Sequence, residues 1–195
     1  MIINDEDIFA IFPQLETRRL MLREITLDDA AEVFRIYSDP QVMRYWGSAP
    51  LQSIDEARRK IEGITAAFRD KEGIRWGITH KGSNRLIGSC GHWRLMKAHF
   101  RSEIGYELAP EYWGQGIMTE ALGAIIRFGF ESMGLHSIEA QIDPANLASR
   151  KVLEKLGFVQ EGYLRENYFV AGKFTDTAIF SLLKSDSHLR GEDQQ

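Results

Sequence analysis

Residues 102–121, S-E-I-G-Y-E-L-A-P-E-Y-W-G-Q-G-I-M-T-E-A, decide the fold because they predict a strand, a glycine turn and a helix in direct succession. The strand is expected to end at Ala109-Pro110, and its two faces alternate, with Ile104, Tyr106 and Leu108 on one and Glu103, Gly105 and Glu107 on the other. After the turn, apolar residues recur at helical spacing from Met118, which predicts a helix to about Ser132.

The glycine turn has the composition of an anion-binding site. Gly114 and Gly116 allow the backbone to approach a ligand closely, and the free amides of a helix N-terminus favour a phosphate. A turn that uses glycine only for its dihedral angles is the alternative interpretation. Glu120, in the first helical turn, would repel a phosphate unless its side chain points away.

Nucleotide-binding motifs fit this turn only in part. No P-loop sequence G-x-x-x-x-G-K-[ST] occurs. Gly114 and Gly116 match the first two glycines of the dinucleotide-binding motif, but Thr119 stands at the third position. An acidic residue about 20 positions further on is present as Glu139, although it falls inside the next predicted strand. A nucleotide-dependent oxidoreductase is therefore kept as an alternative.

The rest of the chain predicts antiparallel hairpins before this segment and a strand, a helix and a hairpin after it. Asp39-Pro40 is expected to end the first helix in a loop, and Asn146 is expected to cap the last one. Strands are predicted over residues 18–23, 76–80, 85–94, 101–108, 137–142, 159–168 and 174–183. The fold class is therefore α/β, with a mixed sheet in one domain over residues 1–184 and a polar, disordered tail over 185–195.

Composition excludes several classes of protein. The 195 residues include 24 basic and 28 acidic side chains, a net charge of -4 that argues against a dedicated nucleic-acid-binding protein. The single cysteine, Cys90, cannot form an internal disulfide, and the five histidines show no metal-ligand spacing, so no metal is expected. No apolar run is long enough for a membrane helix, and no export signal is visible. We therefore expect a cytoplasmic protein without a membrane partner.

Residues 102–121 and 146–158 (N-L-A-S-R-K-V-L-E-K-L-G-F) resemble the acetyl-CoA-binding motifs of the GNAT N-acetyltransferase superfamily. The segments E-T-R-R-L-M-L-R-E at 16–24 and G-K-F-T-D-T-A-I-F-S-L-L at 172–183 are similar to its RimJ/RimL-like branch, which acetylates the N-terminal amines of ribosomal proteins. The resemblance runs from about residue 16 to residue 184. Two motifs at the right separation indicate the superfamily more strongly than they indicate the acceptor.

The resemblance implies where acetyl-CoA binds. The backbone groups of Tyr106, Glu107 and Leu108 would pair with the pantetheine arm as if it were an added strand. Amides of the turn would hold the pyrophosphate, from Gly114, Gln115, Gly116, Ile117, Met118 and Thr119. Asn146 would contact the arm from the second motif. Trp113 and Met118 depart from the superfamily pattern, which usually has Gln or Arg and Gly or Ala at these positions.

Acetyl transfer to an amine needs a neutral nitrogen and a leaving thiolate. An α-amino group has a pKa of about 8 and a lysine of about 10.4, so a lysine acceptor needs a stronger proton sink. Glu103, beside the cofactor strand, is the candidate base and matches the glutamate that several superfamily members use; the alternative is a solvated strand glutamate. Ser149 is the candidate proton donor to the thiolate, as in the RimL-like branch, with an ordinary first-turn serine as the alternative.

Other residues are assigned to the acceptor site or to structural roles. Tyr45, Trp46 and the hairpin at 168–173 are predicted to wall the acceptor site. We interpret Cys90 as a buried hydrophobe, and His92, Trp93 and His136 as structural or surface groups. The basic runs Arg18-Arg19 and Arg58-Arg-Lys60 are most simply solvated faces.

The leading hypothesis is an acetyl-CoA-dependent N-acetyltransferase that acts on a primary amine, preferably the α-amine of a ribosomal or other protein N-terminus. Acetylation of a small amine, such as a polyamine, an amino acid or an antibiotic, is the first alternative. A non-catalytic acyl-CoA sensor is the second, because Trp113 and Met118 depart from the motif. Small acetyltransferases often pair, so a homodimer is a further hypothesis that the sequence leaves open.

Overall fold

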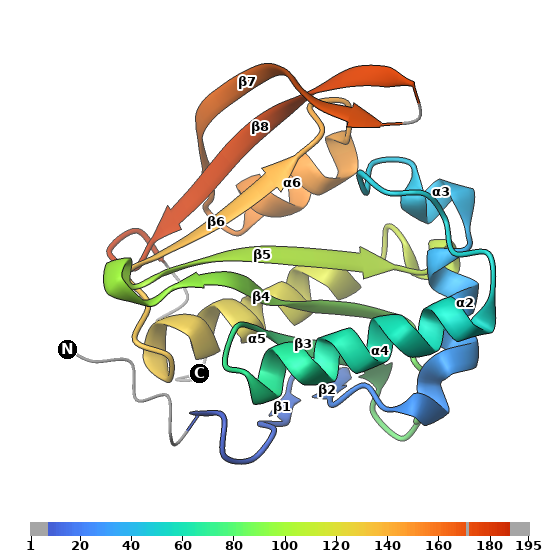
Figure 1. The fold of residues 1–195 in the computed structure, drawn as a ribbon. Coiled ribbons are helices and arrows are strands. Elements are labelled where there is room, and N and C mark those ends of the chain that lie inside the picture. Colours follow the sequence, from blue (N-terminus) through green and yellow to red (C-terminus); the bar gives the residue numbers. More distant parts are fainter. Residues whose placement is uncertain (1–7, 171, 188–195) are drawn as a thin grey trace.

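The computed structural model describes residues 8–170 and 172–187, which form one eight-stranded mixed sheet (Figure 1). The strand order is β1-β2-β3-β4-β5-β6-β8-β7. The strands are β1 (Leu15–Glu16), β2 (Leu20–Arg23), β3 (Ile74–His80), β4 (Gly88–Met96), β5 (Arg101–Leu108), β6 (Ser137–Ile142), β7 (Val159–Val170) and β8 (Lys173–Leu183). Neighbouring strands run antiparallel except β5 and β6, which are parallel. The predicted α/β fold with a mixed sheet is confirmed.

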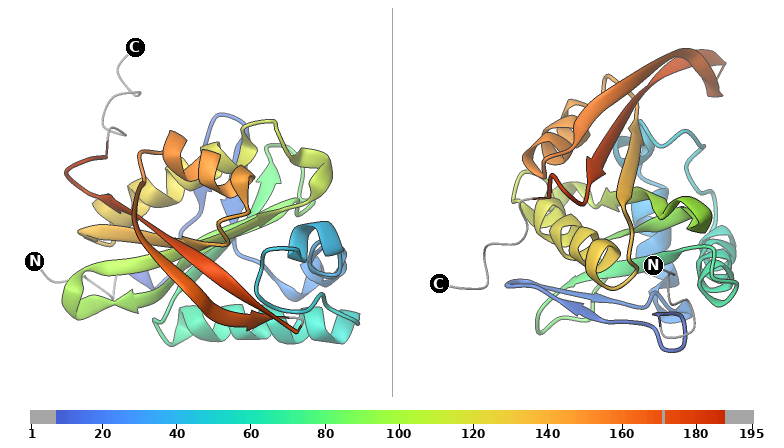
Figure 2. Two further views of the ribbon diagram at one scale, coloured as in Figure 1. Left: turned by 90° about the horizontal axis from the view of Figure 1, so that it is seen from above. Right: turned by 90° about the vertical axis from the view of Figure 1, so that its left-hand side faces the viewer.

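Helices cover both faces of the sheet. They are α2 (Ala30–Tyr37), α3 (Pro40–Met43), α4 (Ile54–Arg69), α5 (Ile117–Glu131) and α6 (Leu147–Lys155), with 3-10 turns η1 (Leu27–Asp29), η2 (Lys97–His99) and η3 (Pro110–Tyr112). Figure 2 shows α4 and α5 on opposite sides of the sheet, with α2 beside α4 and α6 beside α5. The crossover from β5 through α5 places β6 next to β5, as the strand, helix, strand pattern predicts.

The prediction that Asp39-Pro40 ends the first helix in a loop is wrong in one respect. Pro40 begins the short helix α3, because a proline at the first helical position gives up an N–H that would have no partner there. The Asp39 side chain caps this helix by accepting a hydrogen bond from the Gln41 N–H at 2.8 Å. This turn of helix leads into the segment that carries Tyr45 and Trp46.

Pairing between β5 and β6 is confined to their first residues. The register joins Arg101 to Ser137, Ser102 to Ile138 and Glu103 to Glu139, and no pair follows. Beyond Glu103 the two strands separate, and Figure 1 shows the gap between their ribbons widening toward the end of β5. The backbone groups on this edge of β5 therefore have no neighbouring strand, which sets up the site described below.

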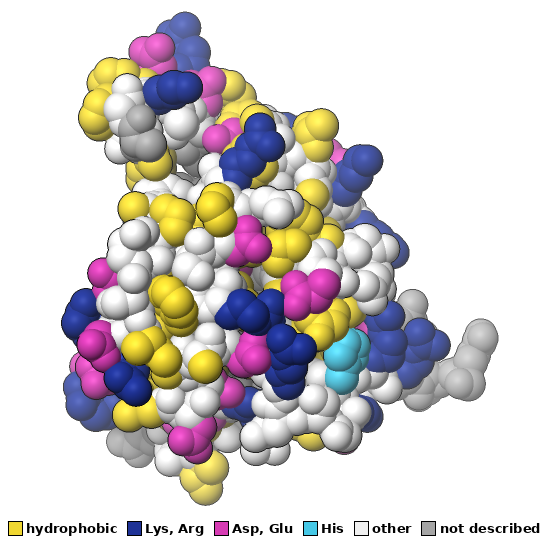
Figure 3. Space-filling model, turned by 90° about the vertical axis from the view of Figure 1, so that its right-hand side faces the viewer, with side chains coloured by type: hydrophobic (Ala, Val, Ile, Leu, Met, Phe, Trp, Pro, Cys, Tyr) yellow, Lys and Arg dark blue, Asp and Glu magenta, His cyan; other side chains and the backbone are white. Residues whose placement is uncertain are grey.

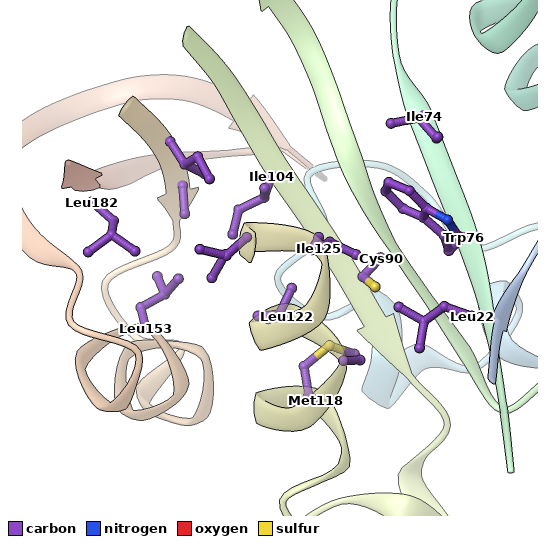
Figure 4. Packing of buried hydrophobic residues seen from close by; sticks show 14 of the residues in the cluster. Leu22, Ile74, Trp76, Cys90, Ile104, Met118, Leu122, Ile125, Leu153 and Leu182 are labelled. Atoms are coloured by element: carbon purple, nitrogen blue, oxygen red, sulfur yellow. The ribbon is translucent and has the colours of Figure 1, made fainter. Parts of the chain in front are cut away.

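The main core lies between α5 and the sheet. Apolar side chains of α5 pack with residues of β2, β3, β4, β5 and β6, and the neighbouring residues Leu153 and Leu182 extend the cluster toward α6 and β8 (Figure 4). Trp76 and Leu122 are fully buried in it. A second cluster joins α2 and α4 to the opposite face, through Val33, Ile36 and Ile61.

Two further observations concern the limits of the domain. Within the described part of the chain, no helix is both long and apolar enough to cross a lipid bilayer. The last strand ends at Leu183, and most of the predicted polar tail, residues 188–195, lies outside the described residues. The domain boundary at residue 184 therefore stays a prediction.

The core predicts a stability difference between two leucine variants. Leu122→Ala removes a fully buried side chain of α5 and is expected to lower the free energy of unfolding by about 2 to 5 kcal/mol. Leu147→Ala changes a side chain that is 61% exposed, and a change within about 0.5 kcal/mol is expected. Urea denaturation of both variants measures the difference, and equal losses would contradict this description of the core.

Candidate active site

The glycine turn at residues 114–116 and the first turn of α5 form an open surface, called the mouth of α5 below. Gly114 and Gly116 adopt left-handed φ angles of 73° and 72°, which strain any residue with a Cβ atom. The helix begins at Ile117 without a side-chain cap, so the first-turn N–H groups keep no helical partner. A Cβ atom placed on Gly114 would meet nothing within 4 Å. The mouth therefore combines open space with backbone donors at the positive end of the helix dipole, which suits an anion.

Glu120 does not oppose an anion at this mouth, because its carboxylate is already engaged. It accepts hydrogen bonds from the Thr17 hydroxyl at 2.6 Å and from the Arg19 N–H at 2.8 Å, and it pairs with the Arg19 guanidinium at 2.6 Å. These hydrogen bonds and the nearby cation lower its pKa against the effect of burial. The interpretation of Arg19 as part of a solvated face is wrong: its Nη1 donates to the Gln115 carbonyl, so the guanidinium borders the mouth.

The two departures from the motif leave the mouth open. Met118 is 9% exposed and its side chain lies among the core residues (Figure 4), so it does not fill the mouth. Trp113 is 47% exposed, and its indole N–H donates to the Leu108 carbonyl at 2.7 Å. Neither side chain blocks the amides of the first helical turn.

The free edge of β5 presents only alternate residues. In an antiparallel pair, every second residue directs its N–H and C=O toward the partner strand. The Ala109 N–H donates to the Ile87 carbonyl, and the register then directs the backbone groups of Glu107 toward Ser89 of β4. Those of Tyr106 and Leu108 face the open edge. The expectation that Glu107 pairs through its backbone with a ligand there is therefore not supported by the geometry.

A cleft of about 680 Å³ lies on the other face of the sheet, between α4 and the β7–β8 hairpin. Its lining includes Tyr45, Trp46, Tyr168 and Val170, so the residues that the sequence predicts as walls of the acceptor site lie around one cleft. Figure 3 shows the hairpin as a projecting lobe, with positive, negative and hydrophobic side chains mixed on the face below it. The cleft reaches the point where β5 and β6 separate, because Glu103, Gly105 and Gln141 line it.

Glu103 stands at that point. It is 5% exposed, it accepts a hydrogen bond from Arg94 at 3.1 Å, and it lies opposite Glu139 in the sheet register. The pKa of Glu103 is raised to about 7, because burial and the nearby Glu139 raise it more than Arg94 and Arg101 lower it. A carboxyl group with this pKa exchanges protons near neutral pH, as a general base must. The alternative interpretation, a solvated strand glutamate, does not fit this burial.

Ser149 lies on the opposite face from Glu103. Asn146 caps α6 by accepting a hydrogen bond from the Ser149 N–H at 3.1 Å, which fixes the first turn of this helix. The Ser149 hydroxyl is hydrogen-bonded to the Tyr106 hydroxyl at 2.5 Å, and burial raises the pKa of Tyr106 to about 12. The sequence points to Tyr106 only for its backbone; the contact between the two hydroxyls is a result of tertiary structure.

The floor of the cleft holds a group that the sequence interpretation misses. Arg75 of β3 is ion-paired with Glu107, whose side chain is buried, and its Nε donates to the Ser89 hydroxyl at 2.6 Å. Gly91 and Gly105, which make room for this side chain, were the available signal. Lys60 of α4 also lines the cleft, with its ammonium 4.1 Å from the Tyr37 ring centroid.

Two residues set aside on sequence grounds are indeed buried. Cys90 is fully buried, and burial raises the pKa of its thiol, so it is a poor nucleophile. His92 is 1% exposed between the Ser102 hydroxyl and the Ile125 carbonyl, each at 2.8 Å, and burial lowers its pKa to about 4. Both side chains serve the packing between α5 and the sheet.

Comparison with known proteins now decides the family. The model of the GNAT acetyltransferase domain matches residues 19–159. The chain belongs to the GNAT acetyltransferases. It is 40% identical over 174 residues to the uncharacterized N-acetyltransferase YoaA of Bacillus subtilis, covering 89% of this chain and 98% of that one. The family assignment decides against the dinucleotide-dependent oxidoreductase that Gly114 and Gly116 left open.

Solved GNAT structures with different partners resemble this acetyltransferase. Mycobacterium smegmatis RimJ in complex with CoA-disulfide has a TM-score of 0.81 at 25% identity, over 89% of this chain and 88% of that one. Spermidine N-acetyltransferase from Vibrio cholerae, in complex with CoA and spermine, has a TM-score of 0.76 at 26% identity, over 86% and 96%. The RimJ/RimL-like resemblance is supported, and the acceptor is not decided by these structures.

The position of Arg19 generates a binding prediction. Arg19→Gln removes a cation beside the mouth of α5 and frees the Glu120 carboxylate, so CoA affinity is expected to fall about tenfold, or about 1.4 kcal/mol. Arg18→Gln is the matched control, because Arg18 is the adjacent arginine and its side chain is exposed. Isothermal titration calorimetry with CoA measures both variants. Equal losses in the two would show that only net charge matters.

Proposed function

We propose that this acetyltransferase moves the acetyl group of acetyl-CoA to the α-amine of a peptide or protein N-terminus. The observation that carries the proposal is the position of Glu103, which lies at the end of the β5–β6 pairing, in the acceptor cleft, with a pKa raised by burial to about 7. The cofactor and the acceptor would approach this point from opposite faces of the sheet.

The residues that would hold acetyl-CoA fit its parts in order. The amides from Gly114 to Thr119 would bind the pyrophosphate, with the Arg19 guanidinium beside them. The backbone of Tyr106 and the N–H of Leu108 would pair with the pantetheine arm along the free edge of β5. Asn146 uses its side-chain oxygen for the helix cap, so its NH₂ group is the part that would reach the arm.

Acetyl transfer then needs three proton movements, and Glu103, Ser149 and Tyr106 are the groups of this chain that would serve them. Glu103 takes the proton of the ammonium form of the acceptor, which frees the nitrogen lone pair to attack the thioester carbon. As the C–S bond breaks, Ser149 protonates the sulfur from its hydroxyl. The proton that nitrogen loses on becoming an amide restores the Ser149 and Tyr106 pair. Glu103 then releases its proton to water, and the products are an N-acetyl amide, the free CoA thiol and one proton.

The strength of the base favours an α-amine. An α-amino group with a pKa of about 8 lies one unit above Glu103, whereas a lysine or polyamine nitrogen near 10.4 lies more than three units above it. Each unit of mismatch costs about 1.4 kcal/mol in the proton transfer. The likeness to RimJ supports the same preference.

A polyamine is the second candidate acceptor. The likeness to the Vibrio cholerae spermidine N-acetyltransferase supports it, and Asp143 and Asp176 line the cleft and would attract a second ammonium group. Asp176 already accepts a hydrogen bond from the Glu166 N–H and another from the Tyr163 hydroxyl, so part of its capacity is used. A non-catalytic acyl-CoA sensor is a weaker candidate, since Met118 and Trp113 leave the mouth of α5 open.

Glu103 predicts the pH dependence of the reaction. Because its pKa is raised to about 7, the ionised form increases as pH rises through 7, and kcat/KM for a peptide is expected to rise with it. Glu103→Gln is expected to lower kcat/KM about 100-fold and to abolish the inflection near pH 7, leaving that of the amine. Glu131→Gln, at an exposed position at the end of α5, is the control. An unchanged profile in the Glu103 variant would remove this residue from the mechanism.

The acceptor class is tested by thiol release from acetyl-CoA. With a panel of N-terminal peptides, spermidine and free amino acids, we expect peptides to have a kcat/KM at least about tenfold above spermidine, or about 1.4 kcal/mol in transition-state stabilisation. A higher value for spermidine would reject the N-terminal acceptor. Binding of CoA without thiol release for any amine would favour the sensor.

A further inference from the structure

The floor of the acceptor cleft is a trough cut across three strands. The register places Arg75 of β3 beside Gly91 of β4, and Gly91 beside Gly105 of β5, so the row contains two residues without side chains. A Cβ atom on Gly91 would lie 2.7 Å from the Arg75 Cα and 2.3 Å from the Ile74 carbonyl oxygen, which no substitution tolerates. The close pairing of β3 with β4 therefore requires glycine at position 91, and the trough follows from the missing side chain.

Arg75 crosses this trough in a fixed position. Its Nε donates to the Ser89 hydroxyl at 2.6 Å and its Nη2 pairs with the Glu107 carboxylate, which is buried and holds the far end of the side chain. Within the described residues, Nη1 has no hydrogen-bond partner. Two anchoring contacts thus leave one end of the guanidinium directed over Gly105.

The indole N–H of Trp93 is a second donor near Gly105. A Cβ atom built on Gly105 would lie 3.6 Å from the Arg75 Nη1 and 3.8 Å from the Trp93 Nε1. The Trp93 indole N–H also lacks a hydrogen bond to any other residue that the structure describes, and both residues line the cleft. Both nitrogens therefore border the open space above Gly105, which leaves room there for an oxygen atom of a ligand.

The charge around this position favours an anion. Arg75 carries a full positive charge and is largely buried, so its hydrogen bonds are stronger than those of an exposed arginine. Lys60 lines the same cleft. An ammonium group placed above Gly105 would leave both N–H donors unpaired and would lie next to the Arg75 guanidinium, which is unfavourable.

The spacing from Glu103 defines which part of an acceptor reaches this position. Glu103 and Gly105 are two residues apart on one strand face, so their Cα atoms are about 6.6 to 6.8 Å apart. In a peptide whose α-amine lies at Glu103, the side chain of the second residue is far enough from the amine to reach the space above Gly105. The side chain of the first residue starts one residue closer to the amine and does not extend that far.

We infer that Arg75 Nη1 and Trp93 Nε1 form a carboxylate-binding subsite above Gly105, which selects acceptor peptides with an acidic residue at the second position. The inference rests on the proposed function and narrows it to a substrate class. It assigns Trp93, an apparent surface residue in the sequence, to acceptor recognition.

The test compares three amidated peptides, Ser-Glu-Ala-Ala, Ser-Gln-Ala-Ala and Ser-Lys-Ala-Ala, as acceptors of the wild-type enzyme, with spermidine as a fourth. We expect kcat/KM for the Glu peptide to exceed that for the isosteric Gln peptide about tenfold, mainly through KM, and the Lys peptide to be poorer still. The Glu and Gln peptides differ only in charge and one hydrogen-bonding group, so their ratio reports the subsite.

Two variants locate the preference without breaking the Arg75 and Glu107 pair. Trp93→Phe keeps an aromatic ring and removes one N–H, and Gly105→Ala places a methyl group where the carboxylate oxygen would lie, at ordinary contact distances. Both are expected to reduce the Glu to Gln ratio to below about threefold. Gly123→Ala on α5, where an added Cβ meets nothing within 4 Å, is the control and should keep the wild-type ratio.

The outcomes separate this inference from the proposed function. If all peptides are acetylated with equal kcat/KM, the subsite is rejected and the N-terminal acceptor stands. If the preference for Glu persists in both variants, the carboxylate binds elsewhere and the subsite is rejected as well. If spermidine is acetylated and no peptide is, the proposed function and the subsite fall together.

Discussion

The separation of β5 from β6 beyond Glu103 is the constraint on which the site depends. A strand inside a sheet satisfies its N–H and C=O groups on both edges, but here one edge of β5 is left without a partner strand beyond Glu103. The α5 helix begins at the end of that edge, with backbone donors that are also unsatisfied. Both places therefore offer backbone groups that a ligand could pair with.

The separation also leaves side chains on both faces of the sheet beside the same gap between β5 and β6. Glu103 lies on the face that carries the cleft, and Ser149 with Tyr106 lies on the face that carries α5 and α6. The sheet therefore separates the Glu103 carboxyl group from the two hydroxyl groups. Arg75 and Glu107 are ion-paired with each other, whereas burial raises the pKa of Glu103 to about 7.

Several features of the site could be predicted from sequence because they depend on residues close together in the chain. The alternation in β5, the two glycines before α5 and the Asn146 cap all act within a few residues, and each is found where the local pattern indicates. The local pattern did not predict the ion pair of Glu120 with Arg19, because it joins residues about 100 positions apart. Arg18 and Arg19 look alike in sequence and differ only in which one faces α5.

The sequence alone determined the strand, glycine turn and helix of residues 102–121, since these follow from side-chain periodicity and from the dihedral freedom of glycine. Only the tertiary structure decided the environment of each functional group. Burial raises the pKa of Glu103, α6 brings the Ser149 hydroxyl to Tyr106, and β3 places Arg75 beside Gly91. Such effects depend on distances between separate elements, and these distances are fixed by packing around the core rather than by any local pattern.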